Sequence, residues 1–198
     1  VANTLSATAG WHAASKQGWE VKVTPYYTRV QDYIDVDRCP VIADGSNGCT
    51  PARLAATSGF VTLKFANHAA RLYGVDASWR APLGGNAGLG RFALLGVFGY
   101  VRGENLDRGG NLYQIMPVNG LVGLEHRRGN WSSAFDFQAV DAKRNVQAVR
   151  NELGTPGYAL LNVRTSYRWK LIEAAAVRLD AGIDNLANRN YALPLGGR

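Results

Sequence analysis

The sequence predicts an all-β fold, specifically a segment of an antiparallel, up-and-down transmembrane β-barrel. Three observations support this prediction. The five tryptophans lie near short turns at one end of the expected strands, several strands alternate between an apolar and a charged face, and short turns alternate with long polar loops. Aromatic girdles, alternating faces and connections of two lengths are typical of membrane barrels.

The tryptophans mark one edge of the expected sheet. An indole ring suits a membrane boundary because its apolar body contacts lipid while its N–H contacts water. We therefore expect a girdle at the periplasmic boundary, made of Trp11, Trp19, Trp79, Trp131 and Trp169. The alternative is a soluble β-sandwich whose tryptophans cover one end, and the two strand faces decide between these folds.

The expected elements are about eight strands, with no convincing helix. Each boundary is placed where an alternating pattern meets a turn or a polar loop. Short turns are expected at residues 15–18, 82–88, 127–130 and 170–176, and long loops at 37–59, 103–115 and 142–157. Between them, in order, the strands cover residues 4–14, 19–36, 60–81, 89–102, 116–127, 131–141, 158–169 and 177–185.

The third, sixth, seventh and eighth of these strands have the clearest two-faced pattern. Every second residue is apolar or neutral, and the intervening residues carry charges of both signs, which fits a hydrated lumen where Arg and Asp on adjacent strands pair. The expected lumen charges are Asp76, Arg80, Arg164, Arg168, Arg178, Asp180 and Asp184. Since soluble antiparallel sheets also alternate, a second protein layer over Val163, Tyr167, Leu179 and Ile183 would contradict the membrane interpretation.

Composition narrows the function classes. The net charge of +7 and mean hydropathy of −0.16 would also suit a soluble domain, and no run reaches the roughly 18 apolar residues of a spanning helix. Barrel strands escape hydropathy analysis because only alternate residues face lipid. The Lys and Arg residues are dispersed rather than clustered with aromatics, which argues against nucleic-acid binding. No catalytic motif is present, so we do not expect an enzyme.

Three segments resemble TonB-dependent outer-membrane receptors. Residues 179–191, LDAGIDNLANRNY, are similar to the signature that closes the penultimate barrel strand of that family, although Ala187 replaces the usual aromatic. Residues 155–169 (TPGYALLNVRTSYRW) and 69–78 (AARLYGVDAS) resemble two other strands. The loop DRCPVIADGSNGC, with RLYGVD, NLYQIMP and YALPLGG, is most similar to the copper-receptor branch.

This resemblance implies a barrel of about 22 strands with a plugged lumen. Residues 1–198 would be roughly the last third of that barrel, with the plug domain and the final strand absent, and the chain starts at Val1 as a processed chain or internal fragment would. The implied function is import of a scarce nutrient across the bacterial outer membrane. Copper is the first expected substrate, and a ferric siderophore, haem or cobalamin is the alternative.

The implied partners are outer-membrane lipid, the receptor's own plug domain and, through the plug, the TonB complex. Arginines at the loop bases would meet lipopolysaccharide phosphates, and those in the lumen would meet acidic groups on the plug. The loop-base arginines are Arg71, Arg102 and Arg144.

Few residues suggest metal chemistry. Cys39 and Cys49 are expected to form a disulfide in an outer loop, since the periplasm is oxidising; a thiolate pair that binds copper or zinc is the alternative. Met116 is a weak candidate for a copper ligand, and packing beside Ile115 is the simpler interpretation. The histidines are expected on separate strands as surface or lumen residues: His12, His68 and His126. We expect no cofactor in this segment, although the complete receptor would bind copper.

Two alternatives from other classes stay open. One is a small, complete eight-stranded barrel that acts as an anchor, adhesin or membrane enzyme, and its last strand would have to pair with its first. The other is a soluble lipocalin-like binding protein, which would be a monodisperse monomer without detergent.

Overall fold

The computed structural model describes residues 1–14, 18–39, 62–172 and 175–196. These residues form one antiparallel sheet and a single short helix, η1 (Ala148–Arg150), and no helix among them is long and apolar enough to cross a membrane. The strands are β1 (Ala2–Ser6), β2 (Ala9–His12), β3 (Glu20–Arg38), β4 (Leu63–Asn86), β5 (Gly90–Asn105), β6 (Asn119–Arg128), β7 (Trp131–Val140), β8 (Tyr158–Ile172) and β9 (Ala175–Ile183).

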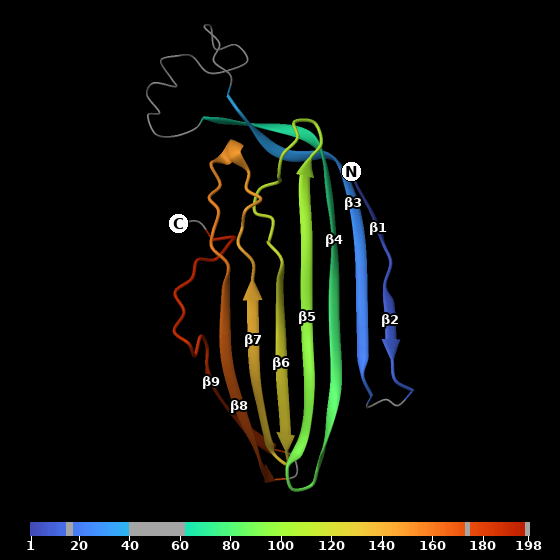
Figure 1. Cartoon of the computed structure of the whole chain (residues 1–198), viewed down its shortest axis with the longest axis vertical. Coiled ribbons are helices and arrows are strands. Elements are labelled where there is room, and N and C mark those ends of the chain that lie inside the picture. Colours follow the sequence, from blue (N-terminus) through green and yellow to red (C-terminus); the bar gives the residue numbers. More distant parts are fainter. Residues whose placement is uncertain (15–17, 40–61, 173–174, 197–198) are drawn as a thin grey trace.

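The strands follow one another as an up-and-down meander, in the order β1-β3-β4-β5-β6-β7-β8-β9 (Figure 1). β2 also pairs with β3, so the single first strand expected at residues 4–14 is divided in two. Pro25 explains the division. The Ala7 N–H donates to the Pro25 carbonyl at 3.2 Å, but Pro25 has no N–H with which to complete the pair.

β5 and β8 run on to Asn105 and Ile172, beyond their expected ends at 102 and 169, so the turn expected at 170–176 begins inside β8. At two other boundaries that differ from expectation, proline is again the cause. β4 does not turn at residues 82–88 but continues to Asn86, because a bulge between Pro82 and Gly84 accommodates the proline within the ladder. β6 begins at Asn119 rather than at residue 116, just after Pro117, which cannot donate to a ladder. The strand order follows the prediction, and the eight expected strands are all present if β1 and β2 are counted as one.

The connections differ in length between the two ends of the sheet (Figure 1). At one end, called the turn end, β4 meets β5 and β6 meets β7 through a few residues. At the other, called the loop end, residues 106–118 join β5 to β6 and residues 141–157 join β7 to β8. The third expected long loop, residues 37–59, begins inside β3, and most of it lies outside the described residues.

The ends of β3 and β4 bend across the loop end of the sheet (Figure 1). The register of the pair shifts between Val30 and Tyr33, and Asp32 within this bulge has a positive φ of 58°. A bulge bends its strand and increases the local twist. Residues 33–38 and 63–68 therefore lie near the connections that follow β5 and β7, where polar side chains from all four segments meet.

The sheet is a single layer, and one whole face stays uncovered in the described part of the chain. Leu179 and Ile183 are 59% and 58% exposed, and Phe137 is also exposed. A small apolar cluster of Val140, Tyr158 and Leu160 lies on the opposite face. A soluble protein rarely leaves so many large apolar side chains in contact with water, so the sandwich expected of a soluble fold is absent from these residues.

Candidate functional site

Four of the five tryptophans lie on the uncovered face, which we call the tryptophan face: Trp11, Trp79, Trp131 and Trp169. Trp11 and Trp79 both lie opposite Val21, and the Tyr167 ring contacts those of Trp131 and Trp169 at centroid distances of 4.8 Å and 4.7 Å. Trp19 precedes β3 and is exposed. Because β4 runs on to Asn86, Trp79 is farther from its turn than expected.

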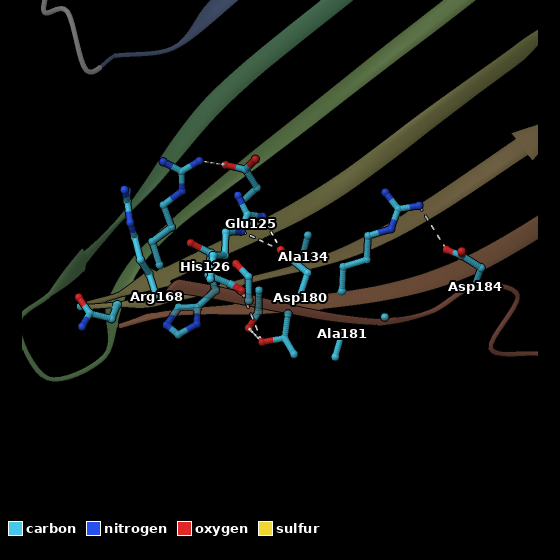
Figure 2. Close-up of a pocket in the computed structure, with 17 residues that line it drawn as sticks. Glu125, His126, Ala134, Arg168, Asp180, Ala181 and Asp184 are labelled. Atoms are coloured by element: carbon cyan, nitrogen blue, oxygen red, sulfur yellow. Dashed lines mark hydrogen bonds and ion pairs between the residues drawn. The ribbon is translucent and has the colours of Figure 1, made fainter. Parts of the chain in front are cut away.

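The other face carries the expected lumen charges, and we call it the charged face. Arg164 contacts Asp184 at 3.2 Å and Arg178 contacts Asp180 at 2.6 Å (Figure 2). Arg168 lies directly opposite Arg178, and Asp76 and Arg80 lie on the face of β4 opposite Trp79. The structure therefore brings the charges of β8 and β9 together beside one concavity of about 870 Å³ near the turn end.

Sequence analysis missed the acidic partner of Arg80. Glu125 on β6 accepts a hydrogen bond from Arg80 at 3.0 Å, with β5 lying between the two strands. The signal was available, because Glu125 alternates with Leu124 on its strand. Ion pairs as exposed as these add at most about 1 kcal/mol each to stability. Their main effect is therefore to keep this face hydrated and charged.

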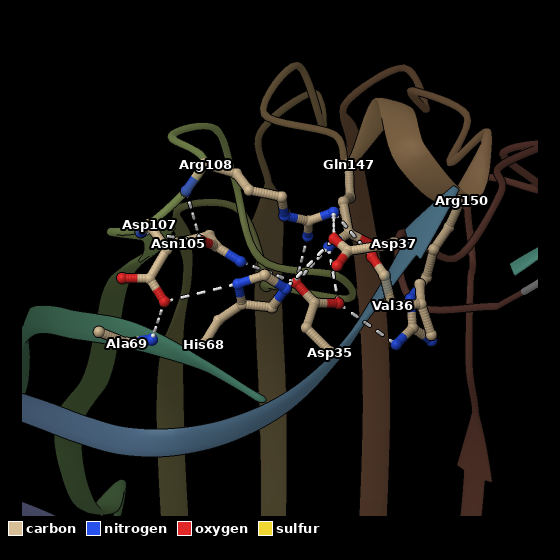
Figure 3. A network of polar contacts seen from close by, with 10 residues as sticks. All are labelled: Asp35, Val36, Asp37, His68, Ala69, Asn105, Asp107, Arg108, Gln147 and Arg150. Carbon is tan, nitrogen blue, oxygen red and sulfur yellow. Dashed lines mark hydrogen bonds and ion pairs between the residues drawn. The ribbon is translucent and has the colours of Figure 1, made fainter. Parts of the chain in front are cut away.

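A second polar site, the loop-end network, is centred on the buried carboxylate of Asp35. Asp35 is 1% exposed and accepts hydrogen bonds from Gln147 at 2.9 and 3.0 Å and from Asn105 at 3.2 Å (Figure 3). The guanidinium groups of Arg108 and Arg150 approach it at 3.1 and 3.4 Å. One carboxylate thus ties the bent end of β3 to both long connections described at the loop end.

The charge of Asp35 is stabilised where it is buried. Burial alone would raise the pKa of the carboxyl. Hydrogen bonds from Gln147, the Val36 backbone and Asn105, together with the charge of Arg108, lower this pKa by more than burial raises it. The net result is a pKa below the ordinary Asp value. The carboxylate is therefore ionised at neutral pH despite its burial.

The network continues through Arg108 and His68. Arg108 donates to the Val36 carbonyl at 2.8 Å and also contacts Asp37. His68 is buried between Asp37 and Asp107, at 3.2 and 3.5 Å, and is neither a surface nor a lumen residue as expected (Figure 3). The β4 end of the bent hairpin is thus held to the same connection as the β3 end.

A buried ion pair supports the far side of this network. Lys143 contacts Glu152 at 2.7 Å, and both side chains are almost fully buried. Glu152 also accepts the backbone N–H of Gln147 at 2.7 Å and that of Gln114 at 3.0 Å. Since removing one member of a buried pair costs several kcal/mol, this pair holds Gln147 in place to donate to Asp35.

Met116, the weak candidate ligand, and the histidines do not come together in the described residues. Met116 packs against the apolar cluster of Val140, Tyr158 and Leu160. His126 on β6 stacks on Phe92 with ring centroids 4.6 Å apart, and the three histidines lie on β2, β4 and β6. No group of three His, Cys, Asp or Glu side chains in the described ranges could hold a metal ion.

The cysteines lie at the boundary of what is described. Cys39 follows β3, and its backbone N–H donates to the Thr62 carbonyl at 2.9 Å. Cys49 lies outside the described residues. The Cys39–Cys49 disulfide therefore stays a prediction.

The signature segment near the end of the chain forms an anchored turn. Asn185 has a positive φ of 54°, and its backbone N–H donates to the side-chain oxygen of Asn162 at 2.8 Å. Its own side chain bonds both the N–H and the carbonyl of Arg189, at 2.8 and 2.9 Å. An asparagine suits this position because it tolerates the left-handed conformation and supplies both a donor and an acceptor.

A single antiparallel layer with one exposed apolar face and one charged face defines the wall of a membrane β-barrel. The family model described as "TonB dependent receptor-like, beta-barrel" matches residues 3–186, and the chain belongs to this family. Among solved structures, the chain is similar to "Copper transporter OprC", with a TM-score of 0.72 and 20% identity. The match covers 98% of this chain and 27% of the transporter chain, so it shows the shared fold. A search of curated protein sequences found no match.

Proposed function

We propose that this chain forms part of the wall and outer loops of an outer-membrane receptor that imports a scarce nutrient with energy supplied by TonB. The observation that carries the proposal is the division of one sheet into an uncovered tryptophan face and a charged face. Lipid would cover the first, and a plug domain with water would contact the second. The chain spans about a quarter of the similar transporter, so transport belongs to the complete gene product.

In this proposal the loop end faces the outside and the turn end faces the periplasm. The loop-end network fixes the long connections in one arrangement, so that they present a stable surface to an incoming nutrient. The paired charges on the charged face would contact polar groups of the plug as it rearranges. No catalytic step is proposed, since the family and the similar structure are described as receptors and a transporter.

Copper is the first substrate to test. Its support is the resemblance of the segments around Cys39, Tyr73, Met116 and Leu193 to copper receptors, together with the printed name of the similar structure. Ferric siderophores, haem and cobalamin are the alternatives in the same family. Metal ligands would come from parts of the receptor other than the described residues, where no three-ligand group exists.

The rival proposal of a small autonomous barrel has less support. An eight-stranded barrel would need its first and last strands to pair, but β1 and β9 are opposite edges of the described sheet. In Figure 1 these strands lie on opposite sides of an open, curved sheet. A partner strand for each edge is what a larger barrel provides.

The first experiment tests location and energy coupling together. The complete gene, from its natural start to its natural stop codon, would be expressed in a Gram-negative host with and without functional TonB. We expect the product in the outer-membrane fraction of both strains. We expect uptake of the imported nutrient only in the strain with TonB. Recovery of a soluble monomer without detergent would contradict the proposal.

The second experiment separates the substrates. Uptake of labelled copper, ferric siderophore, haem and cobalamin would be compared in the same TonB-positive cells, with the empty vector as control. We expect copper accumulation to rise above that of the empty-vector control. Accumulation of ferric siderophore, haem and cobalamin should equal that of the control. TonB-dependent uptake of another nutrient would support the family role and reject copper.

A further inference from the structure

Three arginines gather on the tryptophan face at its loop end, and we call them the arginine cluster: Arg29, Arg71 and Arg102. Arg29 and Arg71 are direct cross-strand partners on β3 and β4. Arg71 lies opposite Glu104 on β5, and Arg102 lies two residues before Glu104 on the same face. Because strand side chains alternate between faces, these side chains share the face of Trp79.

The carboxylate of Glu104 pairs with two of the three arginines. Arg71 contacts Glu104 through Nε at 2.7 Å and Nη2 at 2.6 Å, and the Nε of Arg102 contacts it at 3.2 Å. In the described part of the chain, the Arg29 side chain has no hydrogen bond or ion pair, and the Nη groups of Arg102 have none either. Like charges directly opposite each other are unfavourable, so the Arg29–Arg71 pair leaves an excess of positive charge that an external anion would neutralise.

The position of the cluster matches a lipid headgroup. Arg71 and Trp79 are eight residues apart on β4, which corresponds to about 26 Å along the strand. In a strand tilted by about 40° this length spans about 20 Å of depth, close to the roughly 25 Å apolar band of an outer-membrane barrel. Tyrosines Tyr27 and Tyr73 occupy the next cross-strand row below Arg29 and Arg71, as expected for an interfacial belt.

An apolar groove lies on the same face, next to the cluster across β5 and β6. Its volume is about 430 Å³, and its lining includes Trp79, Phe98, Gly120 and Phe137. Phe98 precedes Arg102 by four residues on the same side of β5, about 13 Å along the strand. A molecule with an anionic headgroup on the arginines would therefore have room for an acyl chain beside it.

We propose that the arginine cluster binds the phosphate groups of an outer-leaflet glycolipid of the lipopolysaccharide type, with one acyl chain in the adjoining groove. This inference rests on the proposed location in the outer membrane. Guanidinium groups suit phosphate because they donate two parallel hydrogen bonds to it. Bound phosphate would neutralise Arg29 and Arg102 while Glu104 keeps Arg71 in place.

The test compares lipid retention between matched variants of the complete gene product. The protein would be purified from outer membranes in mild detergent, and bound lipopolysaccharide would be counted by native mass spectrometry. We expect retention by wild type, a loss of about tenfold or more in Arg29→Gln/Arg102→Gln, and wild-type retention in Arg168→Gln on the charged face. Equal retention in all three, or equal loss in both variants, would overturn the inference.

A second measurement identifies the ligand, and a single variant with a fractionation control covers the case in which the double variant does not fold. In nanodiscs of phosphatidylethanolamine, the protein should bind added lipid A about tenfold more tightly than lipid A that lacks its phosphates. Equal binding of the two lipids would reject a glycolipid site. Inorganic phosphate that binds as tightly as lipid A would also reject it. If the double variant fails to fold, Arg29→Gln alone is used, since the Arg29 side chain has no hydrogen bond or ion pair to lose among the described residues. Outer-membrane fractionation of each variant distinguishes failure of this site from failure of the proposed location.

Discussion

Gln147 donates two hydrogen bonds to the carboxylate of Asp35, at 2.9 and 3.0 Å, although 112 positions separate the residues in the chain. This contact joins the bent end of β3 to the connection before β8. It is made inside the protein and not on the surface, so each partner depends on the other to satisfy its polar atoms. The arrangement of the outer loops is therefore specified by a few buried polar side chains.

Gln147→Leu is expected to loosen the loop end without unfolding the barrel. The variant leaves the Asp35 carboxylate without two of its hydrogen bonds, which costs about 1–3 kcal/mol locally. We expect faster cleavage of the long connections by an external protease, measured on intact cells, while the strands stay protected. Arg144→Gln, which removes an exposed ion pair with Asp141, is the control and should cleave at the wild-type rate.

The loop end should also resist mild acid. Because the pKa of Asp35 is lowered in the folded state, its contribution is complete above the ordinary Asp pKa of about 3.9 and is lost as the pH falls through the lower folded value. We therefore expect acid-stable protease to cleave the loops at one rate down to about pH 4 and faster below it. In Asp35→Asn, cleavage should be fast at every pH. If this variant showed the same pH profile as wild type, Asp35 would not be the group that holds the loops.

Gly96→Ala should destabilise the barrel. A Cβ at this position would overlap the indole ring of Trp79, which lies across the glycine, and overpacking costs about 1–3 kcal/mol. Urea unfolding in lipid vesicles measures the loss. Gly10→Ala is the matched control, since its nearest neighbour would be 3.9 Å away, and the second change Trp79→Ala in the Gly96→Ala background should recover part of the stability.

Neighbouring residues on β7 provide a direct test of the two faces. Phe137 lies on the tryptophan face and Gln138 on the charged face. In a lipid-inserted barrel, Phe137→Arg should lower the free energy of unfolding by about 2–4 kcal/mol, whereas Gln138→Arg should change it little. The measurement is urea unfolding in vesicles. Similar losses in both variants would mean that the tryptophan face does not contact lipid.

The strand order and the two faces were predictable because a pleated strand has a strict two-residue period. That period placed Arg164 and Asp180 on one face from the sequence alone. Proline effects were harder, since Pro25 interrupts one ladder while Pro82 is absorbed by a bulge, and the outcome depends on which neighbouring strand needs the missing N–H.

The loop-end network could not be predicted from local patterns. Asn105 and Gln147 occur in expected loops, and Asp35 lies near the end of an expected strand, far from both in the chain. Only the bend at Asp32 brings Asp35 to the other two. The Asp35, Val36, Asp37 spacing was the one available hint, because it places two acids on the same side of an extended strand.

The collection of tryptophans at one end of one face has a practical consequence for spectroscopy. Intrinsic emission at long ultraviolet wavelengths will report on a single boundary of the protein. Brominated acyl chains should quench this emission according to the depth of the bromine atoms, whereas a water-soluble quencher confined to the lumen should have little effect. Tryptophan fluorescence therefore reports the depth of the native chain in a bilayer, and no dye label is needed to follow its insertion.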